Sequence, residues 1–521
     1  MNAIKKIKSV FATGLVLLLV SCNSWLEVDP EDRIMDNTLF KDKEGFMTAL
    51  NGVYSELNKT SLYGRNLTMG MIDVMAQYYN CNIADHAYAR YMDYSYEDAT
   101  YKTQIDNIWS GLYTMIANCN AIIEHCGNGN SVLPDEYYRM IKGEAIGLRA
   151  MMHLDLLRMF GPIWSATGKE TVCMPYMTVA DRVVQPLLRA DSVMSYIIKD
   201  LETAASLLLT VDPVITEGAK NYGEEVGSND MNYRQYRLNY FAINALMARA
   251  YLWSGNTQKA GEYARTVIEK VSDKNTPLFP LIDADYMEAN SDRVFSPEVL
   301  FSLYNTSRPD VVYKTLFVPT LATTSILTMA GDLATGRVNE TYDDKNDYRY
   351  RMWESTVENN REVTYFIKYM DETRTGSEAY RYMIPLIRMS ELYLIAAECE
   401  TNVQTALDKY FNPLRFSRNC VNQNASSAEE LKSLIRAEYV REFIGEGQLF
   451  FYYKRNALQH IPDGGTVNSI KNISLDSSPY RIVKRASGRS KRNMVLLKRH
   501  EYEKDNIYDR SFLGGYRNDQ L

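Results

Sequence analysis

The sequence predicts an all-α protein built from helical hairpins, with an irregular loop-rich part and little sheet. Most segments of the 521-residue chain read as amphipathic helices whose apolar residues recur every three or four positions, separated by short Gly, Asn, Asp or Pro loops. Few stretches alternate between apolar and polar residues, which is the pattern of a half-buried strand. We therefore expect helices over residues 43–58, 103–126, 134–160, 190–209, 237–254, 257–271, 386–401 and 428–455.

Segment 240–271 has the spacing of a tetratricopeptide hairpin. Ala248 is followed by Tyr251, by Gly255 four residues later, and by Ala260 five residues beyond that. Small residues let two antiparallel helices approach closely, the tyrosine fills the groove between them, and the glycine makes the turn. An unrelated helical hairpin is the alternative. Because one such hairpin cannot bury its own apolar faces, neighbouring helices must stack on it. The candidates are the helices that contain Trp109, Ala150 and Leu394.

The N-terminus has the features of an export signal. Three lysines within the first eight residues precede the apolar run 11–20, which is too short to span a bilayer but fits the core of a signal peptide. The run ends in Leu-Val-Ser-Cys22, the pattern read by lipoprotein processing. We predict that residues 1–21 are removed and that Cys22 receives the acyl chains that anchor the protein. An ordinary secretion signal or an uncleaved signal anchor is the alternative.

Charge and cysteine content narrow the classes of function. Removal of residues 1–21 deletes three lysines and no acid, so the formal net charge falls from -7 to -10. A modestly acidic chain argues against a nucleic-acid-binding protein, which needs a basic face. Besides Cys22 the mature chain has six cysteines, with no CxxC pair and no histidine at ligand spacing. We therefore predict mostly buried thiols and no zinc site.

Several sequence blocks stand in a characteristic order along the mature chain. They are Trp25–Pro30 after the lipidation site, Ile108–Asn120, Gly143–Pro162, the hairpin 240–271, Ile387–Glu398 and Arg436–Gly447. No single block is decisive. In this order and spacing, however, the chain resembles the SusD/RagB family of Bacteroidetes surface lipoproteins over nearly its whole mature length.

The resemblance implies a fold, a role and a location. The fold is a helical body of about four tetratricopeptide-like hairpins with a loop-rich region packed over it. The mature chain then divides into an N-terminal region, 22–285, and a C-terminal region, 286–521. The implied role is binding without catalysis or a cofactor. Such a lipoprotein is anchored in the outer membrane, faces the exterior, and passes oligosaccharides, or in some members peptides, to a SusC-like TonB-dependent transporter.

Four charged residues of the late blocks interrupt otherwise apolar helices. Glu398, Arg441, Glu442 and Glu446 are expected to pair across helices, because an isolated buried charge is very costly. Two carboxylates that flank a glycosidic bond are the alternative interpretation, since that pair is the machinery of a glycoside hydrolase. The sequence singles out no such pair.

The densest aromatic group lies in residues 78–101. Tyrosine offers a flat apolar face and a hydroxyl for saccharide recognition, and the 39 tyrosines outnumber the 16 phenylalanines and five tryptophans together. The stretch is polar and lacks a helical period, so it is predicted to be a long loop of functional importance. In the resembled family the loop after the early helices lies over the binding face. The candidate ligand-binding residues are Tyr78, Tyr79, Asn80, Asp85, His86, Tyr88, Arg90 and Tyr91.

A second aromatic group supplies the candidates Tyr304, Tyr313 and Trp353. Together with the loop 78–101, the stretch 304–353 would form a two-sided clamp for a chain-like ligand. The alternative is that these aromatic residues only pack loops onto the helical body. The acidic run 343–347 lacks the spacing and the glycine of an EF-hand, so no metal site is predicted and calcium is only a weak alternative.

The leading hypothesis is therefore an oligosaccharide-binding lipoprotein. Three alternatives remain open: the same role with a peptide ligand, a helical glycoside hydrolase at the cell surface, and a scaffold whose helical groove binds partner proteins.

Overall fold

The computed structural model describes residues 39–180, 184–221, 228–272, 277–371 and 379–473, with Tyr480 and Ile482. The predicted signal peptide and the lipidation site Cys22 lie outside these residues. The helices are α3 (Lys43–Leu57), α4 (Met71–Met75), α5 (Ala89–Met92), α6 (Ala99–Cys126), α7 (Asp135–Phe160), α8 (Ala190–Leu208), α9 (Val214–Glu217), α10 (Tyr240–Trp253), α11 (Thr257–Val271), α12 (Ala284–Ala289), α13 (Lys314–Leu316), α14 (Arg337–Thr341), α15 (Met389–Cys399), α16 (Val403–Ala406), α17 (Asn412–Ser417), α18 (Ala428–Glu442) and α19 (Leu449–Arg455).

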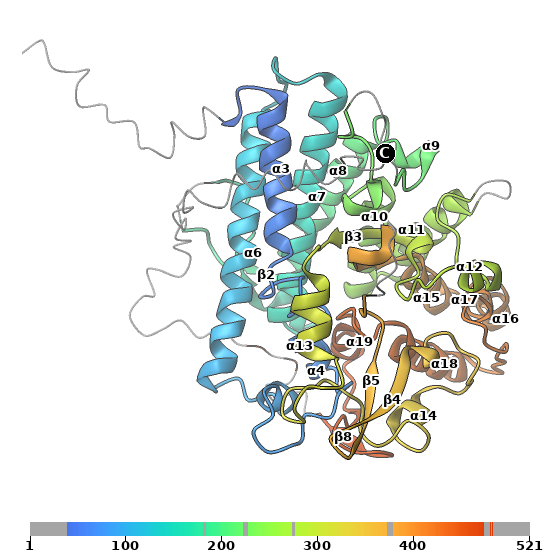
Figure 1. The fold of residues 1–521 in the computed structure, drawn as a ribbon. Coiled ribbons are helices and arrows are strands. Elements are labelled where there is room, and N and C mark those ends of the chain that lie inside the picture. Colours follow the sequence, from blue (N-terminus) through green and yellow to red (C-terminus); the bar gives the residue numbers. More distant parts are fainter. Residues whose placement is uncertain are drawn as a thin grey trace, which may run out of the picture.

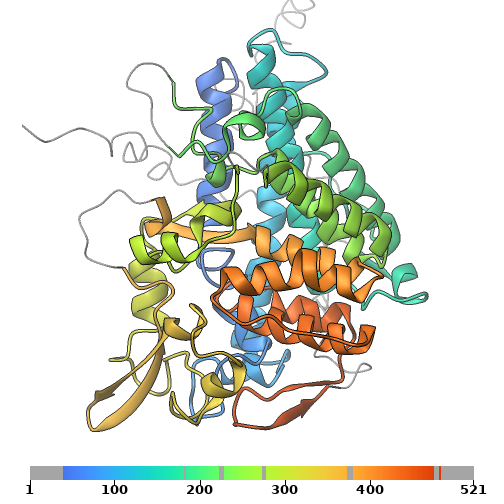
Figure 2. The same cartoon turned by 90° about the vertical axis from the view of Figure 1, so that its right-hand side faces the viewer.

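The long helices form a continuous stack. Helix α3 packs on α6, and each next helix packs on the one before, in the order α6, α7, α8, α10, α11 and α15 (Figure 1). The later helices, from green α10 and α11 to orange α15 and α18, lie in layers in the second view (Figure 2). A Cβ atom on Gly143 of α7 would lie 2.9 Å from a methyl carbon of Leu208, so the glycine allows α7 and α8 to approach closely. The predicted all-α class is confirmed.

The predicted tetratricopeptide-like hairpin is formed by α10 and α11. Ala248 and Ala260 are fully buried where the two helices meet, and the rings of Tyr251 and Tyr263 stack with their centroids 5.7 Å apart. Gly255 has a φ of +75°, the left-handed conformation that ends α10, and the side chain of the next residue caps α11. The small residues and the glycine therefore have the roles that their spacing indicates.

The strands make only small sheets, as expected, and within the described residues each sheet is one antiparallel pair. Strands β3 and β6 form the pair that lies inside the core, with nearly every residue buried. The strands are β1 (Val172–Met174), β2 (Leu188–Arg189), β3 (Val299–Tyr304), β4 (Trp353–Glu358), β5 (Arg361–Phe366), β6 (Met383–Arg388), β7 (His460–Pro462) and β8 (Ile470–Asn472). Within the part of the chain that the structure describes, no helix has the length and apolarity needed to cross a membrane.

Two predicted helices require correction. The range 386–401 begins as the end of strand β6, because its apolar residues pair with β3 before α15 starts. The range 428–455 is two helices, α18 and α19, separated by a turn in which Gly445 and Gly447 have φ values of +82° and +72°. The buried carboxylate of Asp73 accepts hydrogen bonds from the N–H groups of both glycines, at 2.6 and 2.9 Å. This contact ties the turn to α4 and prevents a continuous helix.

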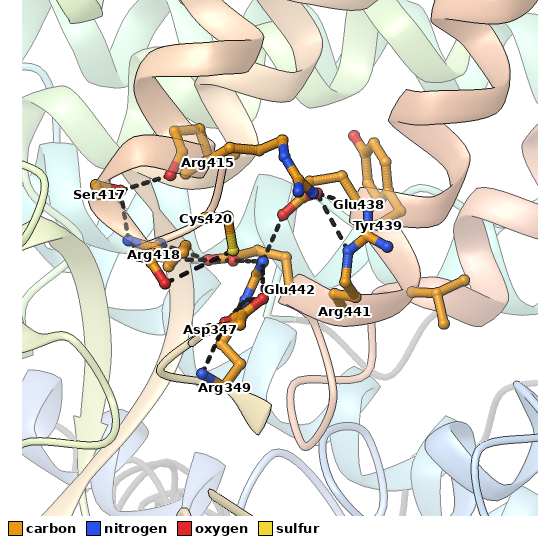
Figure 3. A network of polar contacts seen from close by, with 12 residues as sticks. Asp347, Arg349, Arg415, Ser417, Arg418, Cys420, Glu438, Tyr439, Arg441 and Glu442 are labelled. Carbon is orange, nitrogen blue, oxygen red and sulfur yellow. Dashed lines mark hydrogen bonds and ion pairs between the residues drawn. The ribbon is translucent and has the colours of Figure 1, made fainter. Parts of the chain in front are cut away.

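A buried network of charges joins the C-terminal elements (Figure 3). Glu442 on α18 lies within 2.6 Å of guanidinium nitrogens of Arg349, Arg388 and Arg418, and all four side chains are almost completely buried. Burial alone would raise the pKa of Glu442, but the three arginines outweigh that effect and hold its pKa well below its usual range. The other buried members of the network are Glu298, Asp347, Lys368, Arg415, Glu438, Arg441 and Glu446, and the exposed Asp343 contacts it from its edge.

Glu398, Glu442 and Glu446 pair with other elements, as predicted, whereas Arg441 pairs mainly within its own helix. Arg441 binds Glu438, Glu446 binds Arg388, and Glu398 on α15 binds Arg455 on α19 through two contacts of 2.7 and 2.8 Å. Glu446 and Arg388 form such a pair inside the core, where removal of one partner leaves the other without compensation.

Substitution Glu442→Gln should lower the free energy of unfolding by about 3 kcal/mol, because three buried guanidinium groups then lose their shared anion. Urea unfolding followed by circular dichroism measures the change. The control is Asp310→Asn, which breaks an ion pair of 2.6 Å whose partners are both exposed and should leave the unfolding midpoint unchanged. Equal midpoints for the two variants would contradict the central structural role of the network.

Candidate ligand-binding surface

The loop between α4 and α6 lies directly against the segment that follows α13. The main-chain N–H groups of Asn80 and Ala87 donate to the carbonyl oxygens of Thr328 and Thr324, at 2.7 and 2.8 Å. The loop contains the one-turn helix α5 and is otherwise irregular, as the composition of residues 78–101 predicted. The two predicted walls of the clamp therefore touch each other.

The first two tyrosines of this loop belong to the core. Tyr78 and Tyr79 are fully buried, which corrects the expectation that they line an exposed groove. The hydroxyl of Tyr78 donates to the carbonyl oxygen of Val440 at 3.0 Å, and the ring of Tyr79 lies 6.0 Å from that of Phe317. The hydroxyl of Tyr79 is buried without a hydrogen-bond partner among the described residues. The backbone contacts with 324–328 pull this part of the loop inward and cover both rings.

His86 and Tyr91 also hold the loop in place. The Nδ1 atom of His86 accepts a hydrogen bond from the N–H of Tyr88 at 3.1 Å, so its Nε2–H donates to the carbonyl of Ile326 at 3.2 Å. Burial lowers the pKa of His86 and favours this neutral form. The ring of Tyr91 is buried 4.5 Å from that of Tyr101. These two candidates are accounted for by internal contacts.

Four of the loop candidates remain at the surface. Asp85 and Arg90 are exposed, and Arg90 approaches Asp98 only at 3.8 Å. Asn80 and Tyr88 are half-buried, and burial raises the pKa of the Tyr88 phenol. The loop thus presents one aromatic face and several polar groups instead of a continuous row of tyrosines.

The second predicted group of aromatic residues also contains both buried and surface side chains. Trp353 is buried, with its ring 4.7 Å from that of Phe366, so it is a core residue and its assignment to a surface is corrected. Tyr313 is half-buried. Its burial, and to a smaller extent the carboxylate of Glu354, raise the pKa of its phenol. Tyr304 is half-buried at the end of strand β3.

Tyr304 lies in a group of three half-buried tyrosines, here called the tyrosine triad: Tyr236, Tyr304 and Tyr382. The ring of Tyr304 lies edge-to-face with that of Tyr236 at 5.1 Å and with that of Tyr382 at 5.5 Å. Such edge-to-face pairs fix ring orientation. The sequence analysis missed Tyr236 and Tyr382. The Tyr-Arg-Tyr run before β6 was a visible signal, but nothing in the sequence joins it to residue 304.

Backbone pairing explains how the triad forms. Tyr304 is the partner of Met383 in the β3–β6 ladder, so the preceding residue, Tyr382, lies at the same end of the sheet. Ser302 of β3 donates through its hydroxyl to the carbonyl oxygen of Gln235 at 3.0 Å, which brings the neighbouring Tyr236 to this end as well. Three distant segments therefore contribute one ring each.

Polar groups with unused bonding capacity surround the triad. The Nδ2 atom of Asn58 donates to the carbonyl oxygen of Tyr304 at 3.1 Å, while its Oδ1 atom is buried without a partner. Among the described residues, the buried Nη1 atom of Arg237 and the buried Nε atom of Arg308 also have none. Half-buried aromatic rings with unpaired donors and acceptors close by are features that can orient a polar ligand with an apolar side.

The nearby carboxylates are already hydrogen-bonded. Asp371 is held by Arg381 through contacts of 2.9 and 3.0 Å, and Asp292 accepts from the hydroxyl of Tyr286 at 2.8 Å and from two main-chain N–H groups. In the acidic run 343–347, Asp343 and Asp347 bind arginines. Among the described residues, no group of histidine, cysteine or acidic side chains has the arrangement of a metal site.

The two buried tyrosines give a matched pair of predictions about their placement. Tyr78→Phe should lower the free energy of unfolding by about 1 kcal/mol, because the carbonyl of Val440 loses a buried hydrogen bond. Tyr79→Phe removes a buried hydroxyl that has no partner and should leave stability equal or higher. Urea unfolding of both variants measures the difference. A loss of stability in Tyr79→Phe as large as that in Tyr78→Phe would contradict this placement.

Two family profiles match the sequence. Residues 24–217 match a SusD-like family described as "Starch-binding associating with outer membrane", and residues 320–511 match the SusD family. SusD-like protein P25 of Formosa agariphila is 25% identical over 204 residues, which are 38% of this chain and 37% of that protein. SusD-like protein P2 of the same organism is 23% identical over 304 residues, 56% of this chain and 52% of that protein. The matches thus span about half or less of the length of these relatives.

Solved structures share the fold. A SusD-like carbohydrate binding protein from Bacteroides vulgatus superposes with a TM-score of 0.63 at 18% identity, over 85% of this chain and 95% of that one. A SusD superfamily protein from Bacteroides thetaiotaomicron gives a TM-score of 0.62 at 22% identity, over 84% and 94% of the two chains. With the two family matches and the shared helical stack, this chain belongs to the SusD/RagB family.

Proposed function

We propose that this protein is an outer-membrane lipoprotein that binds an oligosaccharide at the cell surface and delivers it to a SusC-like TonB-dependent transporter. Membership of the SusD/RagB family supports the role. One matching family is described as starch-binding, and one structural relative is titled a carbohydrate binding protein. The division of the mature chain into regions 22–285 and 286–521 remains a prediction that accompanies this role.

The tyrosine triad is the observation that carries the proposal. A sugar ring has an apolar C–H face and a rim of hydroxyls, so it is complemented by an aromatic face beside hydrogen-bonding groups. The three rings offer such faces, and Asn58 offers an unused amide oxygen next to Tyr304. We propose that the triad is the main contact and that the loop residues that remain at the surface extend it along a chain-like ligand. These loop residues are Asn80, Asp85, Tyr88 and Arg90.

Binding without hydrolysis accounts best for the surface. Hydrolysis of a glycosidic bond requires two carboxyl groups on either side of the scissile bond, one acting as an acid and one as a base or nucleophile. Asp292 and Asp371 beside the triad instead accept internal hydrogen bonds from fixed donors. An oligopeptide remains the second candidate ligand, because the unused groups of Asn58 and Arg237 would equally bind main-chain amides.

Substitution of Tyr304→Ala or Tyr382→Ala should weaken saccharide binding about tenfold, since each variant removes one face of the triad. Isothermal titration of the mature protein with neutral, acidic and sulfated oligosaccharides and with oligopeptides measures the affinity. Tyr196→Ala is the control, because Tyr196 is 45% exposed on α8 and contributes no ring to the triad. Unchanged affinity in both triad variants would reject the site. Binding of peptides alone would select the alternative ligand.

The lipid anchor has a separate test. Cys22→Ser should abolish acylation and release the protein from the membrane fraction, because the thioether link to the diacylglycerol can no longer form. Metabolic labelling with a radioactive fatty acid and cell fractionation measure both effects. Cys173→Ser, which changes a half-buried thiol of the body, should remain labelled and membrane-bound. Labelling of the Cys22→Ser protein would contradict the assignment.

A further inference from the structure

We propose that the saccharide bound at the tyrosine triad carries an acidic group, a carboxylate or a sulfate, and that the guanidinium of Arg308 binds this group. The inference rests on the proposed function and adds the chemical class of the ligand. The observation behind it is that Arg308 is a buried cation at this site, and that the edge of its guanidinium formed by Nε and Nη2 has no hydrogen-bond partner among the described residues.

Arg308 is a buried side chain held only by main-chain oxygens. It is 3% exposed, and its Nη1 atom donates to the carbonyl oxygen of Met383 at 2.9 Å and more weakly to that of Tyr380 at 3.4 Å. Its Cζ atom lies 5.4 Å from the ring centre of Tyr369. The Nε atom is buried, and neither Nε nor Nη2 has a hydrogen-bond partner among the described residues.

Other arginines of this protein show what that edge normally binds. Arg149, Arg234, Arg249 and Arg381 each use Nε and Nη2 together to grip the two oxygens of one carboxylate, at 2.6–3.0 Å. This two-pronged contact is the strongest geometry that arginine offers to a carboxylate or a similar oxyanion. In Arg308 the same edge is unoccupied, although a buried cation without an anion is costly.

The position of Arg308 links it to the triad. Its Nη1 atom contacts the carbonyl oxygen of Met383, which is the ladder partner of Tyr304 and the next residue after Tyr382. A saccharide lying on these rings therefore lies next to the guanidinium. Because the Nε atom is buried, its contact with a ligand requires a side-chain rearrangement, a change that is common when partners bind.

Among the described residues, no acidic side chain is hydrogen-bonded to the guanidinium of Arg308. Asp371 and Asp292 act electrostatically on Arg308, and each is hydrogen-bonded to other donors, as described above. Burial lowers the pKa of Arg308 to about 10, so the group still carries its charge at neutral pH. The buried Nη1 of Arg237, the residue after Tyr236, is a second cationic donor without a partner among the described residues.

The test compares ligands that differ only in charge. Mature protein is titrated calorimetrically with oligogalacturonate, with the same oligomer after reduction of its carboxyl groups, and with chondroitin sulfate oligosaccharides. We expect an acidic oligomer to bind at least about tenfold more tightly than the carboxyl-reduced one. We also expect increasing salt concentration to weaken the binding of the acidic oligomer. Preference for the uronate or for the sulfated oligomer then identifies the source of the acidic group.

Arg308→Gln should reduce affinity for the acidic oligomer to that of the reduced one. Arg337→Gln is the matched control, because Arg337 is 4% exposed, also donates to a main-chain carbonyl, and lies outside the triad. Circular dichroism checks that both variants fold. If Arg308→Gln does not fold, the affinities of the unaltered protein for the charged and the reduced oligomers still show whether it recognises an acidic group.

Two results would overturn the inference. One is equal affinity for the reduced and the acidic oligomers, and the other is unchanged affinity for the acidic oligomer in a folded Arg308→Gln protein. Either result would reject recognition of an acidic group by Arg308 and would leave the proposed saccharide role intact. Absence of binding to every saccharide, neutral or acidic, would reject the proposed function itself.

Discussion

The structure depends most on the charge network around Glu442. Hydrophobic burial brings helices together without selecting one register, whereas a buried carboxylate that must meet three guanidinium groups allows few arrangements. Arg388 stands at the last residue of β6, and its partner Glu298 directly precedes β3. We infer that the network fixes this strand pair against α18. Since the tyrosine triad forms at the other end of the same pair, the network and the candidate site are coupled through two strands.

The helical part of this architecture was largely readable from the sequence. Periodicity located α3, α7, α8 and α11 to within a residue or two. The side chains of Asp42 and Asn256 cap α3 and α11, and Pro134 directly precedes α7. Periodicity failed where tertiary contacts override local preference. Strand β6 looks helical until β3 is available as a partner, and the break after Glu442 depends on Asp73, a residue some 370 positions away. Contacts between residues so far apart in the sequence produce no local sequence pattern.

The candidate site was predictable only in part. Composition identified the loop 78–101 and the stretch 304–353 as aromatic, and the loop does contact residues 324–328 of that stretch. It did not separate buried rings from surface rings, since tyrosine is compatible with both environments. Tyr78 and Tyr79 therefore proved to be core residues. The triad was missed because its three members come from segments that only the β3–β6 pairing and the hydrogen bond from Ser302 bring together.

The central claim is that a saccharide lies on the tyrosine triad, on a platform held rigid by buried charges. A crystal structure of the mature protein with a bound oligosaccharide tests it most directly. The account predicts a sugar ring against the faces of Tyr304 and Tyr382, with hydrogen bonds to the free amide oxygen of Asn58. A ligand bound elsewhere on the helical stack, with the triad uncovered, would contradict it.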